Sequence, residues 1–330
     1  MTRIADQYRI ITSRAGWIDR ETRGRLKFEG ADALTFLQGL LTNDVSHLQR
    51  GHGVYAAWLT ALGRMTADIV VLHRGGHLVG LVGDGLGAAL AARFDSMIFA
   101  EQLTVMDASA DLADLLVTGT AAAEVTAEAT GAAVAALASL EELSQIDMPD
   151  VPGGFVVRVG ESSFPAFRIV VPQANKARIV AAIEAAGAAA MTEPMTTALR
   201  IEAGRGEWGH DLSEDVIPLE AGLIDRAIST SKGCYVGQEI VIRILHRGGG
   251  RVAKRLVVLA CDASLREAPA APVALEHEGS VVGHLTSAAF SPARECVIAL
   301  GYLQRAVTEI GQRVTIAGTG ATAVVTDFAR

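Results

Sequence analysis

The eight residues KGCYVGQE, from Lys232 to Glu239, decide how the rest of this chain is interpreted. They set Cys234 between glycines, and the only other cysteines are at positions 261 and 296. No CxxC pair or local cluster of metal ligands can therefore form, and we expect no metal site. Lys232 and a helix that begins near Gly237 would both favour the thiolate. The pattern indicates either a nucleophilic or redox-active thiol, or a small buried side chain, which is the usual role of an isolated cysteine.

The neighbours of Cys234 favour a functional site. Glycines allow the backbone to approach a ligand closely, and the amide and carboxylate that follow place polar groups beside the thiol. The residues predicted to surround the cysteine are Lys232, Gly233, Tyr235, Gly237, Gln238 and Glu239.

Four other segments carry distinctive patterns. They are GADALTFLQGLLTNDV (30–45), YAAWLTALGRMTAD (55–68), LRIEAGRGEWGHDL (199–212) and GHLTSAAFSPARECVIALGYL (283–303). Together with KGCYVGQE and the Arg243 that follows it, and in this order, they resemble the YgfZ-type folate-binding proteins, relatives of the T protein of the glycine cleavage system. The resemblance touches every third of the chain.

The resemblance implies an α+β fold: two ferredoxin-like α+β units around a central folate cavity, and a C-terminal β-barrel domain. We expect a folate-binding region over residues 1–245, in which 1–50 with 140–245 forms one subdomain and 51–139 the other. The barrel is expected over 246–330.

Apolar spacing independently predicts mixed helices and strands without a steady βαβ rhythm. Helices are expected within 30–45, 87–97, 120–140 and 174–190, a hairpin over 69–83, and strands at 155–160 and 166–172. After about residue 251, short apolar runs broken by Gly and Pro predict a barrel or a small sandwich.

Composition is typical of a soluble globular protein. The chain has 330 residues, half of them hydrophobic, which is enough for two or three domains. It has no run of about 18 uncharged apolar residues and its N-terminal segment lacks the apolar core of a signal peptide, so we expect a cytoplasmic protein without a membrane partner. The few, scattered cysteines argue against a disulfide framework. A net charge of −8 disfavours nucleic acid unless a local patch overrides it.

One basic run follows the KGCYVGQE motif, since no acidic residue lies between Glu239 and Asp262. The run is either a solvated turn or a docking site for an anion. Tetrahydrofolate has a tail of one or more glutamates, so the resemblance favours binding of that tail. RNA is a weaker interpretation because no aromatic side chains interleave with the charges. The residues predicted to bind the tail are Arg247, Arg251, Lys254 and Arg255.

The pterin ring of folate presents an amino group and a ring N–H side by side, so one buried carboxylate can accept both hydrogen bonds. The resemblance to the T protein segment assigns that role to Glu202 in LRIEAG; otherwise Glu202 is a surface residue paired with a nearby arginine. Tyr55 and Leu41 are predicted walls of the cavity, although such residues are more often core. Arg243 is predicted to orient the ligand or the Cys234 loop.

One departure from the T protein affects the chemistry. The resemblance places two successive aspartates where this chain has Ala67 and Asp68, and one of that pair lies close to the reacting folate nitrogen. Asp68 is therefore the predicted catalytic carboxylate. Loss of the partner acid is expected to slow aminomethyl transfer about 10²-fold or more. The T protein also lacks the cysteine of KGCYVGQE, and both differences favour the YgfZ branch.

A competing motif lies at Gly83, Gly85 and Ala88, a GxGxxA between an apolar run and a helix. It imitates a dinucleotide-binding turn. The acidic residue expected about 20 positions later is ambiguous, because only Glu101 and Asp107 are available. A tight strand-to-helix turn explains the motif more simply.

The YgfZ resemblance implies a tetrahydrofolate-dependent accessory factor for assembly or repair of iron–sulfur clusters in client enzymes, including radical enzymes that modify tRNA, with no direct contact to nucleic acid. Cys234 would act on a partner protein or its cluster by redox or thiol-exchange chemistry. Three scattered thiols cannot hold a cluster by conventional four-cysteine ligation. Two alternatives remain: a folate-dependent aminomethyltransferase or demethylase acting on a small methylated substrate, and a binding protein without chemistry.

Overall fold

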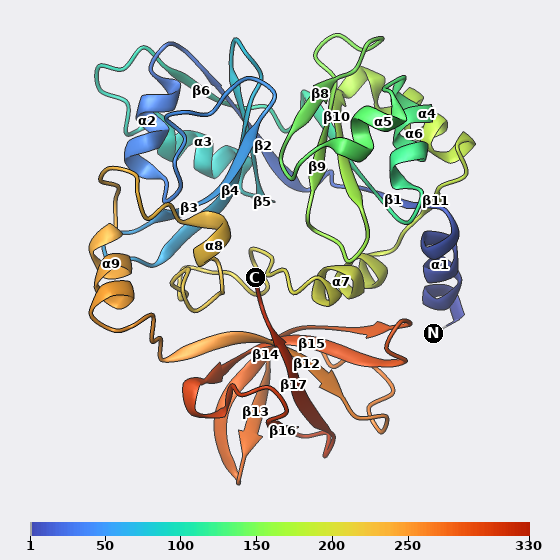
Figure 1. Cartoon of the computed structure of the whole chain (residues 1–330), viewed down its shortest axis with the longest axis vertical. Coiled ribbons are helices and arrows are strands. Elements are labelled where there is room, and N and C mark those ends of the chain that lie inside the picture. Colours follow the sequence, from blue (N-terminus) through green and yellow to red (C-terminus); the bar gives the residue numbers. More distant parts are fainter. Residues whose placement is uncertain (1) are drawn as a thin grey trace.

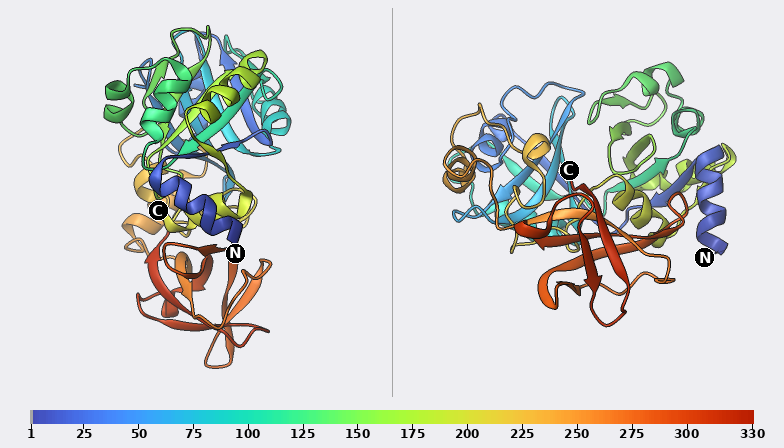
Figure 2. Two further views of the ribbon diagram at one scale, coloured as in Figure 1. Left: turned by 90° about the vertical axis from the view of Figure 1, so that its right-hand side faces the viewer. Right: turned by 60° about the horizontal axis from the view of Figure 1, so that its bottom comes forward.

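The computed structural model describes residues 2–330, and it has two α+β units side by side above a barrel (Figure 1). The left view of Figure 2 shows the barrel as a separate lobe below the two units. No helix of the described chain is long and apolar enough to cross a membrane.

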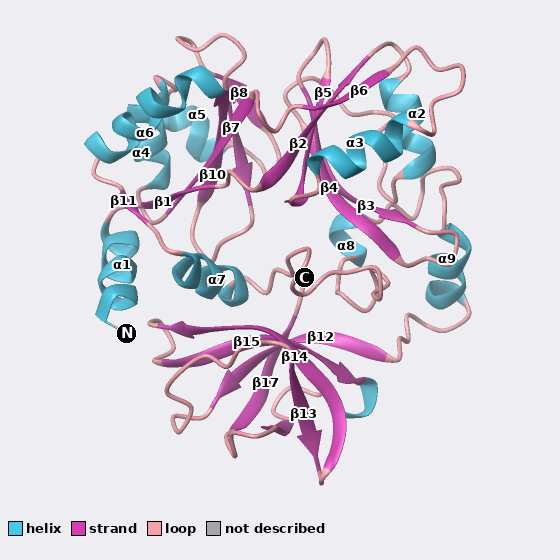
Figure 3. Ribbon diagram, turned by 180° about the vertical axis from the view of Figure 1, so that it is seen from behind, coloured by secondary structure: helices cyan, strands magenta, loops and turns pink. Residues whose placement is uncertain are grey.

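The first unit is built on a five-stranded antiparallel sheet. Its order is β3 (Gly53–Leu59), β4 (Met65–His73), β5 (Leu78–Asp84), β2 (Arg23–Glu29) and β6 (Thr104–Asp107). Helices α2 (Ala33–Leu40) and α3 (Gly87–Asp95) lie on the outer side of this sheet (Figure 3). The buried residues Phe36, Leu37 and Leu40 of α2 have helical spacing and join the apolar core beneath the sheet, which confirms the helix expected within 30–45.

The second unit is built on a six-stranded sheet. Its order is β11 (Ala189–Ala190), β1 (Gly16–Asp19), β7 (Leu112–Thr118), β10 (Ala166–Pro172), β9 (Phe155–Val159) and β8 (Gln145–Asp147). Its helices are α4 (Ala122–Thr130), α5 (Val134–Ser139) and α6 (Lys176–Ala185). Apolar side chains of α4 and α6 pack with those of β7 and β10 in one core. The strands expected at 155–160 and 166–172 are confirmed as β9 and β10.

The C-terminal domain is a closed barrel, which decides between the barrel and the small sandwich. Its strands, in order around the barrel, are β12 (Lys254–Cys261), β15 (Cys296–Gln304), β14 (Ser280–Ser291), β13 (Val273–His277), β16 (Arg313–Ile316) and β17 (Thr322–Phe328). Closure pairs every strand on both sides and leaves no free sheet edge. The fold is therefore the expected α+β arrangement with a C-terminal barrel.

The remaining helical segments lie before β1, between the second sheet and the barrel, or as short turns within the second unit and the barrel. They are α1 (Thr2–Ser13), α7 (Glu193–Glu202), α8 (Ile224–Ala227), α9 (Gln238–His246) and the 3-10 turns η1 (Gln173–Asn175) and η2 (Arg305–Val307). Helix α7 packs against the barrel strands β14 and β15. The core beneath it contains Leu199, Leu212 and Tyr302, so it joins the α+β units to the barrel.

The boundaries between the two α+β units differ from the subdomain boundaries that the sequence predicted. Strand β2 and helix α2, expected with 140–245, belong with the first sheet, whereas β7, α4 and α5, expected within 51–139, belong with the second. Apolar periodicity identifies a strand but not the sheet that it joins, because pairing depends on contacts distant in sequence.

The glycine motif at 83–88 is a strand-to-helix turn between β5 and α3. Strand β5 pairs antiparallel with both β4 and β2, whereas a dinucleotide-binding turn requires a parallel βαβ unit. The dinucleotide interpretation is therefore excluded.

Candidate functional site

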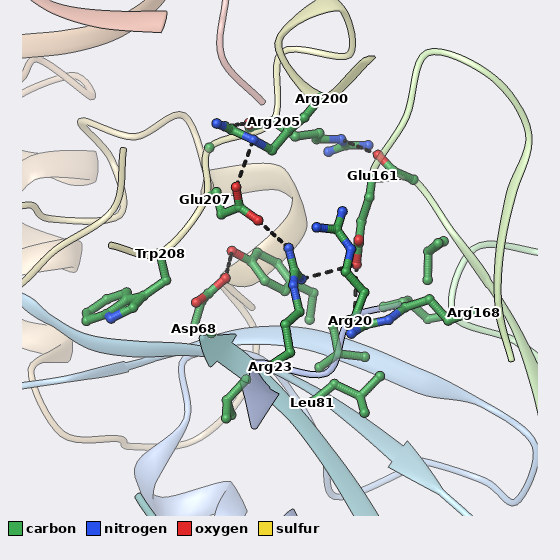
Figure 4. Close-up of a pocket in the computed structure, with 18 of the residues that line it drawn as sticks. Arg20, Arg23, Asp68, Leu81, Glu161, Arg168, Arg200, Arg205, Glu207 and Trp208 are labelled. Carbon is green, nitrogen blue, oxygen red and sulfur yellow. Dashed lines mark hydrogen bonds and ion pairs between the residues drawn. The ribbon is translucent and has the colours of Figure 1, made fainter. Parts of the chain in front are cut away.

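A polar cavity lies between the two sheets and the segment that follows α7 (Figure 4). Counting its open side, the cavity has a volume of about 780 Å³. Its wall contains two of the predicted site residues, Tyr55 and Asp68. The charged residues of the wall are Arg20, Arg23, Arg168, Arg200, Arg205, Arg226, Asp68, Asp84, Glu142, Glu161 and Glu207.

Asp68 reaches the cavity because successive residues of β4 point to opposite faces of the sheet. Ala67 is buried in the apolar core under α2 and α3, while Asp68 and Val70 line the cavity. An acid at position 67 would therefore point into that core. The expectation that Ala67 removes half of a catalytic pair is thus wrong for this fold, and position 68 alone presents a carboxyl group to the cavity from this stretch.

Asp68 is held by Tyr55, whose hydroxyl donates a 3.0 Å hydrogen bond to Oδ2. The Arg226 guanidinium lies 4.7 Å from the centre of the Tyr55 ring. Asn43 fixes both neighbours, since its Nδ2 donates 2.9 Å hydrogen bonds to the carbonyls of Tyr55 and Arg226. Burial raises the pKa of Asp68 above its usual value, although the Tyr55 hydrogen bond opposes the change. Asp68 therefore keeps a proton at higher pH than an exposed aspartate does.

A chain of alternating charges crosses the cavity and joins the three bodies. Arg168 of β10 pairs with the buried Asp114 and lies 3.2 Å from Glu161. Arg23 of β2 lies 3.7 Å from Glu161 and 2.5 Å from Glu207. The members of this chain, in order, are Asp114, Arg168, Glu161, Arg23, Glu207, Arg200 and Asp211.

The barrel end of the charge chain is equally well bonded. Arg200 of α7 lies 3.1 Å from Glu207 and 2.5 Å from Asp211. Asp211 Oδ1 accepts hydrogen bonds from Thr286 at 2.5 Å and Ser287 at 2.8 Å, both on β14. The cavity wall is thereby fixed to the barrel by charge-assisted hydrogen bonds.

The arginines keep the cavity glutamates ionised. Burial raises the pKa of Glu161, but Arg168 and Arg23 outweigh burial and lower it to about 2. Burial likewise opposes ionisation of Glu207, and Arg200 and Arg23 hold its pKa below the usual value. Asp68 is thus the one of these three carboxyl groups whose pKa is raised, which gives it a different chemical character from the glutamates.

Two further arginines share one carboxylate at the more exposed part of the wall. Glu142 lies 3.3 Å from Arg226 and 3.8 Å from Arg205. Burial, and then the charge of Arg226, lower the pKa of Arg205 to about 10.

The predicted pterin ligand Glu202 lies outside the cavity wall. At the end of α7, its carboxylate accepts hydrogen bonds from Ser163 at 2.8 Å and from Ser291 of the barrel at 2.6 Å. Five residues further on, Glu207 lies in the wall instead. Leu41 is also outside: it is fully buried and packs with Trp58 in the core of the first sheet.

The KGCYVGQE motif forms a loop that leads into α9. Gly237 precedes the helix with a φ of 83°, and a Cβ at this position would lie 2.4 Å from the carbonyl of Thr60, so only glycine fits. The helix expected near Gly237 is confirmed. Tyr235 is buried, Gln238 accepts a 3.2 Å hydrogen bond from its amide, and Glu239 is exposed on the first turn of α9.

Lys232 and Cys234 have separate surroundings. The Lys232 ammonium donates hydrogen bonds to the carbonyls of Gln38, Leu41 and Asn43 at 2.6–2.9 Å. Burial lowers the pKa of Lys232 to about 8. Lys232 therefore caps the end of α2, whereas Cys234 is exposed as a free thiol and Gly233 beside it has open space.

The basic run does not form one surface. Arg243 and Arg247 are exposed on and just after α9, and Arg251 is exposed in the following turn. Lys254 lies 4.0 Å from Glu220 and Arg255 stacks over Phe328, both at the start of the barrel. None of these five basic residues lies in the cavity wall. The position of the cavity therefore supports neither the predicted tail site nor the predicted role of Arg243 in orienting the ligand.

Sequence reasoning missed most of the cavity wall. Glu207 and Trp208 belong to the segment LRIEAGRGEWGHDL, and the Trp208 side chain packs closely on Gly83. Arg20 and Arg23 lie in DRETRGR, where five charged residues around a turn were the available signal. Glu161 and Arg168 carry no local pattern that separates them from surface charges.

Comparisons with known proteins agree with this architecture. The family model described as GCVT N-terminal domain matches residues 1–232, and the one described as Glycine cleavage T-protein C-terminal barrel domain matches residues 254–328. Residues 233–253, which contain Cys234 and α9, lie between the two matches.

Among curated relatives, the chain is 26% identical over 320 residues to an aminomethyltransferase of Desulfitobacterium hafniense, covering 95% of this chain and 85% of the relative. It is 28% identical over 325 residues to that of Symbiobacterium thermophilum, covering 95% and 84%. The crystal structure of glycine cleavage system aminomethyltransferase T from Bartonella henselae has the same fold, with a TM-score of 0.85 at 21% identity, covering 98% of this chain and 88% of that one.

Proposed function

The chain belongs to the family of the glycine cleavage T protein, and from this premise we propose that it binds tetrahydrofolate, or a one-carbon derivative, in the central cavity and acts on the one-carbon group. The single observation that carries the proposal is Asp68: a buried carboxyl group with a raised pKa and one unused oxygen, facing a polar cavity.

The residues of the cavity fit a folate. Five buried polar atoms of its lining residues have no hydrogen-bond partner among residues 2–330: Asp68 Oδ1, Glu161 Oε2 and the Nε atoms of Arg20, Arg23 and Arg200. They offer both acceptors and donors, which suits a ring system with N–H and carbonyl groups. Buried polar atoms without partners are costly, so a polar ligand that satisfies them gains affinity.

The geometry supports a role for Asp68 in proton transfer. Tyr55 occupies Oδ2, so Oδ1 alone remains to accept one hydrogen bond. One free oxygen suits a single N–H or a proton in transit, and not the two adjacent donors of the pterin edge. Tetrahydrofolate supplies the nitrogen atoms that carry the one-carbon group. Asp68, with its raised pKa, holds or releases a proton beside them, and Tyr55 with Asn43 keeps the carboxyl group in place.

This proposal favours aminomethyl transfer from a small substrate, the activity named for the curated relatives. The test is anaerobic turnover with tetrahydrofolate and a panel of small aminomethyl and N-methyl donors, with 5,10-methylenetetrahydrofolate and 5-methyltetrahydrofolate measured by chromatography. We expect Asp68→Asn to slow product formation about 10²-fold, the usual contribution of a general acid or base. A wild-type protein that forms neither product with any donor would remove the enzymatic proposal.

A second function is favoured by one specific observation. Cys234 is an exposed free thiol in KGCYVGQE, within the residues that neither T-protein model covers. The resemblance of this motif to YgfZ-type proteins suggests a tetrahydrofolate-dependent accessory factor for iron–sulfur clusters of client enzymes, among them radical enzymes that modify tRNA. The cluster would belong to the client, and Cys234 would meet the client from the surface.

The second function is tested in cells that lack the native gene, by measuring the activities of iron–sulfur enzymes. Cys234→Ser is compared with Cys296→Ser, a half-buried barrel cysteine that serves as the matched control. Loss of client activity with Cys234→Ser alone supports the accessory role. Full activity of Cys234→Ser removes the cysteine from the mechanism.

A further inference from the structure

Arg20 is a buried arginine without a partner. It follows β1 at the crossing between the two sheets, and its side chain lines the central cavity between Arg23 and Arg168 (Figure 4). The residue is only 9% exposed. Within residues 2–330 its guanidinium makes no hydrogen bond and no ion pair within 4 Å, and its Nε is among the buried atoms without a partner.

The carboxylates near Arg20 are already engaged. Glu161 is shared between Arg168 and Arg23, and Glu207 between Arg23 and Arg200. Burial lowers the pKa of Arg20, and the like charges of Arg23 and Arg168 act in the same direction. A buried cation without hydrogen-bond acceptors costs folding free energy, so its retention calls for a compensating interaction.

Charge balance supplies part of that compensation. The chain from Asp114 to Asp211 contains four carboxylates and three arginines, and Arg20 makes the numbers equal. Balance of charge does not occupy the N–H groups, however. A guanidinium has five N–H donors in a rigid plane. Arg20 lines the cavity, and its Nε is fully buried without an acceptor.

We propose that Arg20 binds a carboxylate of the ligand that enters the central cavity, through the paired hydrogen bonds typical of arginine and carboxylate. The cavity wall has six arginines against five carboxyl groups, one of them Asp68, so it accommodates an added negative charge. The proposal rests on the proposed function in that the cavity holds the ligand. The carboxylate has two sources: the glutamate tail of a folate, or the carboxylate of a small amino-acid co-substrate.

The experiment measures the affinity of three probes by anaerobic calorimetry: tetrahydrofolate, 6-methyltetrahydropterin, which has no carboxylate, and sarcosine added to protein saturated with 6-methyltetrahydropterin. The variants are Arg20→Gln, Arg20→Lys, which keeps the charge but not the planar fork, and Arg178→Gln, an exposed arginine of α6, as the matched control. Because Arg20 makes no hydrogen bond or ion pair with the described residues, Arg20→Gln breaks none and is expected to fold.

Each source predicts its own pattern. If Arg20 binds the glutamate tail, Arg20→Gln lowers the affinity for tetrahydrofolate at least about tenfold and leaves the affinity for 6-methyltetrahydropterin unchanged. If Arg20 binds the co-substrate carboxylate, the same variant lowers the affinity for sarcosine at least about tenfold. The affinities for tetrahydrofolate and 6-methyltetrahydropterin stay unchanged. In either case Arg20→Lys recovers only part of the affinity, because an ammonium lacks the fork.

Two results would overturn the assignment. The first is that Arg20→Gln binds all three probes with the affinities of Arg178→Gln. The second is that Arg20→Gln lowers the affinity for 6-methyltetrahydropterin as much as that for tetrahydrofolate, which would place Arg20 against the pterin. Failure of the proposed function is distinguishable, because the wild type would then bind neither pterin. If the wild type binds neither pterin, sarcosine is added to the protein without a pterin. Binding of sarcosine by the wild type and its loss in Arg20→Gln would then still support the carboxylate site. Absence of all binding would end both proposals.

Discussion

The central cavity and the surface formed by the KGCYVGQE loop with α9 differ in how far their functional side chains are buried and paired. Along the charge chain of the cavity, from Asp114 on one side to Asp211 at the barrel, the charges are buried or half-buried and every one is paired. On the loop and α9, Cys234, Ile242 and Arg243 are exposed. The helix buries one residue, Val241.

This difference separates two kinds of recognition. A paired, buried wall is rigid and suits a small molecule that must be oriented to within fractions of an ångström. An exposed thiol in a loop beside an amphipathic surface helix is accessible to a macromolecule. We infer that the cavity and the motif surface serve different ligands, linked through Lys232, whose ammonium contacts Asn43 behind the cavity residue Tyr55.

The largest effect is expected from breaking a buried pair of the cavity. Asp114 is fully buried and accepts two hydrogen bonds from Arg168. Asp114→Ala leaves Arg168 in the interior with Glu161 alone, so the free energy of unfolding should fall by about 3–5 kcal/mol. Urea denaturation measures this loss.

A second variant separates pairing from charge. Asp114→Ala combined with Arg168→Met removes both charges, and most of the lost stability should return, because an apolar pair often replaces a buried ion pair without loss. Asp6→Ala, which breaks an exposed pair with Arg9, should change stability by less than about 1 kcal/mol. A loss below about 1 kcal/mol for Asp114→Ala as well would mean that the cavity is no more rigid than the surface.

A smaller effect is expected at the link between the two regions. Lys232→Met removes an ammonium that donates to three backbone carbonyls, and should destabilise the protein by about 1.5–3 kcal/mol at pH 7. Even with its pKa lowered to about 8, Lys232 is mostly charged at that pH. Lys254→Met, whose pair with Glu220 is 4.0 Å long, is the control. Equal losses in the two variants would show that Lys232 has no special role.

Asp68 should give a pH dependence in place of a constant loss. Its pKa is higher in the folded protein than in the unfolded chain, so between these values the folded state binds more protons and the free energy of unfolding falls as pH rises. Asp68→Asn should flatten this part of the curve above pH 4, as read from thermal midpoints across the range. An unchanged slope would mean that Asp68 ionises as an exposed aspartate does.

The smallest effect belongs to the motif surface itself. Because Cys234 is exposed, Cys234→Ser should change stability by less than about 0.5 kcal/mol and leave folate affinity unchanged. Calorimetry and urea denaturation test both statements. A stability loss above about 2 kcal/mol would show that the thiol is packed against other groups, and the idea of two independent regions would fail.

The sequence predicted what is encoded locally. The hairpin of β4 and β5, the helix after Gly237 and the barrel strands follow from apolar spacing and glycines within a few residues. The cavity face of Asp68 was also readable in principle, because alternation along a strand sets Ala67 and Asp68 on opposite faces.

The rest of the site could not be predicted because it is assembled from distant segments. Glu202 and Glu207 are five residues apart in one charged stretch, yet the end of α7 directs one toward Ser291 and the loop brings the other to Arg23. Only the packing of α7 on the barrel decides between them. The same holds for Arg20 and Glu161, which line one cavity because two sheets face each other.

The most direct test of the account is anaerobic calorimetry of tetrahydrofolate binding to the wild type, Asp68→Asn and Glu202→Gln. We expect the wild type to bind, Asp68→Asn to lose at least about 1 kcal/mol, the scale of one hydrogen bond, and Glu202→Gln to bind as the wild type does. No binding by the wild type, or a loss in Glu202→Gln with none in Asp68→Asn, would contradict the claim that the central cavity is the folate site.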